Sequence, residues 1–301
     1  MNVPSVMPTL SNAGNNMKVI LCLINFFLIY NTYAQINVIT SIEPITFVVE
    51  EIGKDLVKTT TLIGQGKDPH TYTPTPEQIK NLGSAQFYFA VGAQFESIIL
   101  TKIKNQKKLT IVMLDQNFTK RKMESDQSHE PKSNHLHHES ELDPHIWLSK
   151  DAIKNMAQII SSTLSKHDPG NQSKYQAHLK EFLNELSKAV NQSHQLLAPL
   201  KGKKVFVFHP AFGYFLDEFN LLQESIELEG KSPSPRHIVN IIKQAKVEKT
   251  KVIFVSPQFS IKAAQTIAGG INGEVISINP LEKNILKNYL NMAAAIKKAY
   301  E

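Results

Sequence analysis

The sequence predicts an α/β protein with two strand-and-helix segments on either side of one long helix. Short apolar runs rich in β-branched residues alternate with amphipathic stretches over residues 36–114, which is the pattern of buried strands and surface helices. The same alternation returns over residues 201–301. Between them, residues 171–198 carry apolar side chains at helical spacing. This alternation of strands and helices is typical of parallel sheets covered by helices.

The N-terminal segment contains strands and helices in turn. Its strands are short runs of β-branched and aromatic residues, predicted at residues 36–42, 57–64, 85–92 and 110–114. The amphipathic stretches between them predict helices at residues 45–54, 76–82 and 94–104. A further helical stretch follows the motif at residues 143–149. This order predicts one α/β sheet for this part of the chain.

Residues 171–198 are predicted to form a single long helix. Asp168-Pro169-Gly170 precedes it as a start signal, and Pro199 follows it as a stop. At about 1.5 Å per residue, the helix would be about 40 Å long. A helix of that length can join two lobes, and it can also pack along a single domain. The spacing of its apolar residues allows both.

The C-terminal segment repeats the pattern. Its strand-like runs lie at residues 204–209, 223–228, 251–256 and 274–278. Its helical stretches lie at residues 212–219, 235–246, 261–269 and 285–300. The sequence therefore predicts a second α/β sheet after the long helix.

Residues 1–34 have the layout of a secretory signal peptide. Lys18 precedes a short apolar run, and a small-residue cleavage site ends at Ala34. The run is shorter than the roughly 20 apolar residues that a transmembrane helix needs. We therefore expect export from the cytoplasm and a mature chain of residues 35–301, with Met17 as an alternative start of translation.

The composition excludes several classes of protein. The 301 residues contain one cysteine, Cys22, which excludes a disulfide framework and every multi-cysteine zinc site. Cys22 lies inside the expected signal peptide. Only three apolar residues separate it from Lys18, which is too short a run to precede a lipidation site. The net charge of +6 comes from scattered lysines, so we expect no nucleic-acid partner.

The eleven histidines fall into three groups. Residues 124–142 contain four histidines and five acids with almost no apolar side chain, which predicts a loop that buries no core. Four others stand in polar surroundings and are expected to be solvated: His167, His178, His194 and His237. The remaining three lie where a strand gives way to a loop: His70, His145 and His209. Ligands gather at such strand ends in α/β sheets.

The tripeptide Asp-Pro-His occurs twice, at residues 68–70 and 143–145. Proline fixes the backbone φ angle before each histidine. Each aspartate can accept a hydrogen bond from one ring nitrogen and so orient the imidazole for a ligand at the other. His209 ends the strand predicted at residues 204–209.

Spacing alone leaves two interpretations of these three histidines open. They are separate packed or capping side chains, or they share one metal ion. The histidine-rich segment at residues 124–142 favours a metal, because exported tracts of this kind commonly bind transition metals. Imidazole suits Zn²⁺, Cu²⁺, Ni²⁺ and Fe²⁺, and a cysteine-free site built from histidines favours zinc.

Together these motifs resemble those of the zinc-specific solute-binding proteins of ABC transporters, within the wider zinc and manganese receptor group. The resemblance extends over residues 35–301. Its motifs include DPHTYTPTPEQI (68–79), VGAQFE (91–96), DPHIWLS (143–149), FHPAFGYF (208–215) and VIFVSPQFS (252–260). It implies two lobes, each a parallel-type sheet flanked by helices, joined by one long linking helix with the metal in the cleft between the lobes. The implied boundaries are 35–168, 169–200 and 201–301.

The resemblance also implies the metal ligands. They are His70 and His145 from the first lobe and His209 from the second. A histidine in the third position, rather than a carboxylate, indicates the zinc branch of the group.

The fourth ligand in that family is often an acid of the second lobe. The matching residue here is Asn279, which is neutral and a poor zinc ligand. We therefore expect a water molecule as the fourth ligand, or an acid from elsewhere such as Asp68 or Glu43.

The implied function is that of a periplasmic receptor, acting as a monomer and not as an enzyme. It would capture Zn²⁺ as transported cargo rather than as a catalytic cofactor, and deliver it to an ABC-transporter permease. Residues 124–142 would collect or sense zinc near the cleft, or form a solvated insertion with incidental affinity. The alternatives are a manganese or iron receptor or a metal-dependent adhesin on the same scaffold. An exported zinc hydrolase has less support, because the sequence lacks the H-E-x-x-H and G-x-S-x-G motifs.

Overall fold

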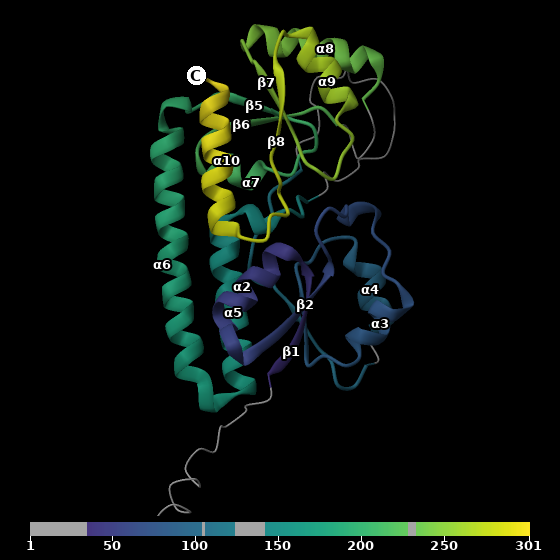
Figure 1. Ribbon diagram of the computed structural model, residues 1–301, viewed down its shortest axis with the longest axis vertical. Coiled ribbons are helices and arrows are strands. Elements are labelled where there is room, and N and C mark those ends of the chain that lie inside the picture. The colour runs from purple at the N-terminus through teal and green to yellow at the C-terminus, as the bar shows by residue number, and fades with distance from the viewer. Residues whose placement is uncertain (1–34, 104–105, 124–141, 228–232) are drawn as a thin grey trace, which may run out of the picture. The chain divides into compact units, whose positions relative to one another are not determined.

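The computed structural model describes residues 35–103, 106–123, 142–227 and 233–301. The expected signal peptide, and all but the last residue of the histidine-rich segment, lie outside these described residues. The described chain forms two four-stranded sheets whose paired strands are parallel, with helices flanking each sheet (Figure 1). The predicted fold class is confirmed. Within the described ranges, no helix has the length and apolarity needed to cross a membrane.

The first sheet has the strand order β2-β1-β3-β4. Its strands are β1 (Ile36–Ile42), β2 (Val57–Ile63), β3 (Phe87–Ala90) and β4 (Thr110–Met113). The helices between them are α2 (Glu43–Gly53), α3 (Pro76–Leu82) and α4 (Glu96–Ile103). Alternate strand residues face opposite sides of the sheet. Val38 and Phe89 therefore join the core that contains α2, whereas Ile39 and Tyr88 join a smaller core with α3 and α4.

Two long helices follow the first sheet. α5 (Lys150–His167) begins after Ser149, whose side chain accepts a hydrogen bond from the Ala152 backbone N–H. α6 (Gln172–Leu197) matches the helix predicted at residues 171–198. α6 packs on α2 and α5, and it also packs against α10 (Ile285–Ala299), which follows the second sheet (Figure 1). A helix in contact with both parts of the chain agrees with the linking role rather than with packing along a single domain.

The second sheet repeats the topology of the first, in the order β6-β5-β7-β8. Its strands are β5 (Lys204–Val207), β6 (Leu222–Ser225), β7 (Val252–Val255) and β8 (Glu274–Ser277). Its helices are α7 (Gly213–Glu218), α8 (Pro235–Val247), α9 (Lys262–Gly270) and α10 (Ile285–Ala299). β5 ends two residues before the predicted boundary, because the chain bends at Phe208 and His209.

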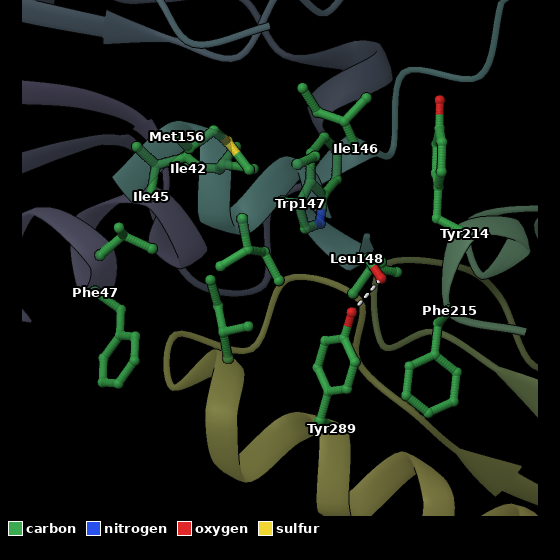
Figure 2. Close-up of a cluster of buried hydrophobic side chains, with 14 of the residues drawn as sticks. Ile42, Ile45, Phe47, Ile146, Trp147, Leu148, Met156, Tyr214, Phe215 and Tyr289 are labelled. Atoms are coloured by element: carbon green, nitrogen blue, oxygen red, sulfur yellow. Dashed lines mark hydrogen bonds between the residues drawn. The ribbon is translucent and has the colours of Figure 1, made fainter. Parts of the chain in front are cut away.

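Side chains from both parts of the chain meet around the short 3₁₀ helix η3 (Ile146–Leu148), which follows the second Asp-Pro-His motif (Figure 2). The Tyr289 hydroxyl of α10 donates a hydrogen bond to the Leu148 carbonyl oxygen over 2.6 Å. The Trp147 indole N–H donates to the Pro280 carbonyl oxygen over 2.8 Å. Residues distant in the sequence therefore hold this segment in place. The lobe boundaries inferred from the sequence stay a prediction.

Candidate metal centre

Three histidines that are far apart in the sequence meet in the structure. His70, His145 and His209 each offer a ring nitrogen, and these three atoms all lie within 4.8 Å of one another. The Nε2 atoms of His145 and His209 are 3.3 Å apart. The ring centroid of His70 lies 4.8 Å from that of His209 and 5.7 Å from that of His145. The structure thus brings together all three residues that the sequence singled out, and their binding of a metal stays a prediction.

Each histidine lies in a loop or turn beside a strand or a short helix. His70 lies in the 3₁₀ turn η2 (Pro69–Thr71) after β2, His145 precedes η3, and His209 lies just after β5. Parallel strands bring their carboxyl ends to one edge of a sheet, and ligands gather at that edge. His145 and His209 are buried, whereas His70 is exposed. One of the three candidate ligands therefore faces solvent.

The two Asp-Pro-His motifs share a backbone contact but use their aspartates differently. Asp143 Oδ1 accepts the backbone N–H of His145 over 3.0 Å and also lies 2.8 Å from its ring Nδ1. Asp68 Oδ1 accepts the backbone N–H of His70 over 2.9 Å, and its Oδ2 accepts the Thr71 hydroxyl over 3.2 Å. The predicted orientation of an imidazole by its aspartate is confirmed for Asp143. Because an ionised carboxylate only accepts, Nδ1 of His145 is the donor, and in the neutral ring Nε2 then carries the lone pair.

Glu227 is a site residue that the sequence reasoning missed. Its Oε2 lies 3.0 Å from Nδ1 of His209, and both side chains are buried. The register of the second sheet explains this contact. Val207 of β5 pairs with Ser225 of β6, and two further residues along each chain bring His209 opposite Glu227. The strand-like run predicted at residues 223–228 contains two charged residues, Glu224 and Glu227. A charged residue in such a run is the signal that could have pointed to Glu227.

Burial dominates the electrostatics of His209. Burial lowers the pKa of His209 below its ordinary 6.5; the hydrogen bond with Glu227 acts in the opposite direction, and nearby His145 lowers it further. The His209 ring stacks on Phe259, with ring centroids 4.6 Å apart and an interplanar angle of 24°. Trp147 lies edge-on to His145 at 5.3 Å. Phe259 covers one face of the buried His209 ring, and burial favours the neutral form of this imidazole, which is the form that binds a metal.

Comparison with known proteins shows the family of this chain. The family model described as ZnuA, zinc-uptake complex component A periplasmic, matches residues 38–299. The chain belongs to this family. It is 28% identical over 288 residues to the high-affinity zinc uptake system protein ZnuA of Yersinia pestis, covering 89% of this chain and 91% of that protein. It is 27% identical to the protein of the same name from Bacillus subtilis, covering 82% of this chain and 79% of that protein.

Solved ZnuA structures have the same fold as this chain. A crystal structure of ZnuA is 33% identical and superimposes with a TM-score of 0.82, covering 89% of this chain and 100% of that one. A zinc-bound ZnuA deletion mutant, also 33% identical, gives a TM-score of 0.79 and covers 88% and 98% of the two chains. The laminin-binding protein Lmb of Streptococcus agalactiae is 21% identical with a TM-score of 0.78, over 89% and 100% of the two chains, which shows the fold alone.

Asn279 occupies the position where the resemblance to zinc receptors of the ZnuA kind suggests an acid. Its Oδ1 accepts hydrogen bonds from Gln258 Nε2 and from the Leu281 backbone N–H, both over 3.0 Å. Among the described residues, no carboxylate belongs to the group of ligand atoms that lie within 4.8 Å of one another. Neither Asp68 nor Glu43 therefore joins the three histidines in that group. A water molecule as the fourth ligand stays a prediction.

One of the four histidines expected to be solvated is buried instead. His237, near the start of α8, is 4% exposed, and its Nε2 lies 3.1 Å from the Ile226 carbonyl oxygen. The prediction was wrong because the polar neighbours of His237 in the sequence lie on other faces of α8. His237, Ile241 and Ala245 recur every four residues and form the buried face of this helix. His194 is exposed, as predicted.

Proposed function

We propose that this protein is a periplasmic zinc receptor that captures Zn²⁺ on His70, His145 and His209 and delivers it to an ABC-transporter permease. Zn²⁺ is the transported cargo in this proposal. The observation that carries it is the 3.3 Å separation between the Nε2 atoms of His145 and His209. Membership of the ZnuA family supports it, as does the zinc bound in a related structure of 33% identity.

The separation of these two nitrogens fits a single ion. Zinc binds imidazole nitrogens at about 2.0–2.1 Å in tetrahedral geometry, which places two such nitrogens about 3.3–3.4 Å apart. The Nδ1 atoms of His145 and His209 face the carboxylates of Asp143 and Glu227. In the neutral rings, which are the forms that bind a metal, both Nδ1 atoms therefore carry the proton and both Nε2 atoms keep a lone pair. Two lone pairs at this distance repel each other, and a cation bound between them turns that repulsion into attraction.

The candidate ligands come from both sheets. His70 follows β2 of the first sheet and His209 follows β5 of the second, so a shared ion would link the loops of both. We propose that the lobes are residues 35–168 and 201–301, with 169–200 as the linking helix. Because α6 packs on helices of both parts, binding would produce small tilts and loop rearrangements. A permease can use such differences to distinguish the loaded receptor from the empty one.

The cellular part of the proposal concerns export. Residues 1–34 would act as a signal peptide, and the mature protein would act as a monomer in the periplasm. The apolar run behind Lys18 and the periplasmic description of the family support this. Mass spectrometry of the exported protein provides the test. An N-terminus at Gln35 supports cleavage after Ala34, and retention of residues 1–34 contradicts it.

Metal titration of the mature chain tests the site. We expect one tight zinc site in the wild-type protein. His145→Ala and His209→Ala remove ligands, so each should lose more than the roughly 10- to 100-fold in affinity that outer-shell substitutions cost. His194→Ala is the matched control, because this exposed histidine lies outside the cluster. Wild-type affinity in two of the three variants His70→Ala, His145→Ala and His209→Ala would rule out the site.

Competition between Zn²⁺ and Mn²⁺ tests the choice of metal. Imidazole donors suit zinc, whereas carboxylate donors suit manganese. We expect zinc to remain bound in an excess of Mn²⁺. Preferential binding of Mn²⁺ would favour a manganese receptor. Growth of a zinc-uptake mutant under zinc limitation tests delivery, and failure of this chain to restore growth beside its own permease would contradict the transport role.

A further inference from the structure

Arg121 lies beside the candidate metal centre without belonging to the three-histidine group. Its Nη1 is 3.5 Å from Oδ2 of Asp143, and its Nε is 3.1 Å from Oδ2 of Asp217 on α7. Asp143 is the residue whose other carboxylate oxygen holds the ring of His145. One guanidinium group therefore contacts two carboxylates. The first is buried against His145, and the second belongs to a helix of the second sheet.

The backbone around Arg121 is tied to the same neighbours. Its carbonyl oxygen accepts the Asp143 N–H over 2.9 Å, and its own N–H donates to the Tyr214 hydroxyl over 3.0 Å. The Tyr214 hydroxyl in turn donates to the Asp143 carbonyl oxygen over 2.9 Å. The guanidinium lies over the Tyr214 ring, 5.9 Å from its centroid. Arg121 and Tyr214 together hold Asp143 through both its backbone and its side chain.

Gly213, the first residue of α7, leaves the space that this guanidinium occupies. A Cβ at position 213 would collide with Nη1 of Arg121 and would lie 3.2 Å from Oδ2 of Asp143. Gly213 is not among the glycines with positive φ, so its backbone conformation suits any residue. Glycine is therefore needed at this position for space rather than for conformation.

The burial of Asp143 explains why the contact with Arg121 matters. Asp143 is fully buried, and a buried carboxylate is costly unless hydrogen bonds and an opposite charge compensate it. Oδ1 faces the two N–H groups of His145, whereas Oδ2 faces Arg121. If the guanidinium moved away, Oδ2 would lose its counter-charge, and the carboxylate would be free to rotate away from the imidazole.

We propose that Arg121 is a positioning residue that holds Asp143 against the ring of His145 and couples that ring to α7 through Asp217. This inference rests on the proposed function, in which His145 binds a divalent cation through Nε2. Its consequence is that affinity for the cation depends on a contact between the segment after β4 and helix α7. The residues that make this contact do not themselves touch the cation.

Gly213→Ala tests the proposal without changing any charge. Its methyl group displaces the guanidinium, while alanine suits a helix better than glycine does. We expect zinc affinity to fall about 10- to 100-fold, the range typical of a lost outer-shell partner. Arg121→Gln should lose a similar amount, and Arg121→Lys less, because lysine keeps the charge. Lys120→Gln is the matched control, since the Lys120 side chain pairs with Asp115 over 2.8 Å rather than with Asp143.

Two further measurements separate positioning from a general loss of structure. The visible absorption spectrum of bound Co²⁺ reports ligand geometry, and we expect it to change in Gly213→Ala and to stay the same in Lys120→Gln. In a His145→Ala background, Gly213→Ala should have no further effect on affinity, because Arg121 acts through that ring. Unfolding of the metal-free variants identifies any that fail to fold. Asp217→Asn replaces any variant that fails to fold. This substitution removes only the charge of the exposed Asp217 on α7, and it should still weaken zinc binding.

The outcomes distinguish this inference from the function on which it rests. Unchanged zinc affinity in both Gly213→Ala and Arg121→Gln, with His145→Ala still losing zinc, overturns the positioning role and leaves the zinc receptor intact. An equal loss in the presence and absence of His145 also overturns it. Wild-type affinity in Asp217→Asn overturns the link to α7. Absence of tight zinc binding in the wild-type protein overturns the proposed function itself.

Discussion

The indole N–H of Trp147 donates a hydrogen bond to the carbonyl oxygen of Pro280, 133 residues further along the chain, over 2.8 Å. Trp147 lies two residues after His145, and Pro280 directly follows Asn279. This bond therefore ties the segment that carries one candidate ligand to the loop after β8. In that loop, Asn279 occupies the position where the resemblance to zinc receptors suggests an acid.

Trp147→Phe should destabilise the metal-free protein. Phenylalanine keeps a buried ring but removes the donor, so the Pro280 carbonyl oxygen loses its indole partner. Leaving a buried acceptor unsatisfied costs about 1–3 kcal/mol. Denaturant unfolding followed by circular dichroism measures this. Tryptophan fluorescence does not serve, because Trp147 is the only tryptophan and the substitution removes it. A free energy of unfolding within about 0.5 kcal/mol of the wild-type value would contradict the prediction.

Glu227→Gln should weaken zinc binding about 10- to 100-fold, because the carboxylate that orients His209 becomes a neutral amide. Glu224→Gln is the matched control. Glu224 lies on the same strand, β6, but pairs with Lys204 over 3.1 Å. Titration of both variants with zinc measures the difference. Equal affinities in the two variants would show that Glu227 does not position His209.

Acid should release zinc. Each imidazole must be neutral to bind the metal, and histidine takes up a proton near pH 6.5. Since burial lowers the pKa of His209 below 6.5, protons compete with zinc at this residue only under more acidic conditions. Calorimetric titration should therefore show a level affinity above about pH 7 and a steep loss toward about pH 5. An affinity that stays constant over this range is incompatible with a three-histidine centre.

His209 should also make the stability of the metal-free protein depend on pH. The unfolded chain takes up a proton at this histidine near its ordinary pKa of 6.5, and the folded protein does so only at lower pH. Its contribution to stability is therefore complete above about pH 6.5 and is lost as the pH falls through the folded pKa. The difference in unfolding free energy between wild type and His209→Gln should shrink on acidification. A difference that grows would reverse the sign of the inferred shift.

Asn279→Asp should raise zinc affinity roughly tenfold, or about 1.4 kcal/mol. Both hydrogen-bond partners of Oδ1, Gln258 Nε2 and the Leu281 N–H, are donors, so an aspartate keeps them while it adds a negative charge. Competition with a chelator measures the change. Asn284→Asp is the matched control, because Asn284 Oδ1 also accepts a backbone N–H, that of Lys287 over 2.9 Å, and an aspartate keeps this bond. Unchanged affinity in Asn279→Asp would mean that its side chain does not reach the ion.

Much of the fold could be predicted because each element carries its own local pattern. β1 at Ile36–Ile42 and α3 at Pro76–Leu82 coincide with the predicted boundaries, and α6 differs by one residue at each end. The predicted strand at 204–209 ends early because its apolar run continues into the bend that presents His209. Residues in this bend, such as Phe208, are apolar because they are buried beside the site. Their amino-acid type therefore does not distinguish them from strand residues.

The candidate site also contains residues that the sequence predicts and residues that it does not. His70 and His145 are visible in the sequence because each belongs to an Asp-Pro-His motif. Glu227 could not be assigned, because its place depends on the pairing of β5 with β6, which no local pattern records. Arg121 and Gly213 are harder still, since their contact requires the segment after β4 to meet α7. Local periodicity predicts elements, whereas the partners that orient the histidines depend on tertiary packing.

The unequal exposure of the three histidines has a kinetic consequence. His145 and His209 are buried and each contacts a carboxylate, whereas His70 is exposed. If the three histidines hold the ion as proposed, an incoming donor atom would replace the His70 nitrogen first, while both buried rings stay in place. Exchange of the ion would begin at His70 and proceed by substitution rather than by spontaneous escape. A receptor built in this way can hold its cargo at very low free concentration and still transfer it quickly to a site that offers a competing ligand.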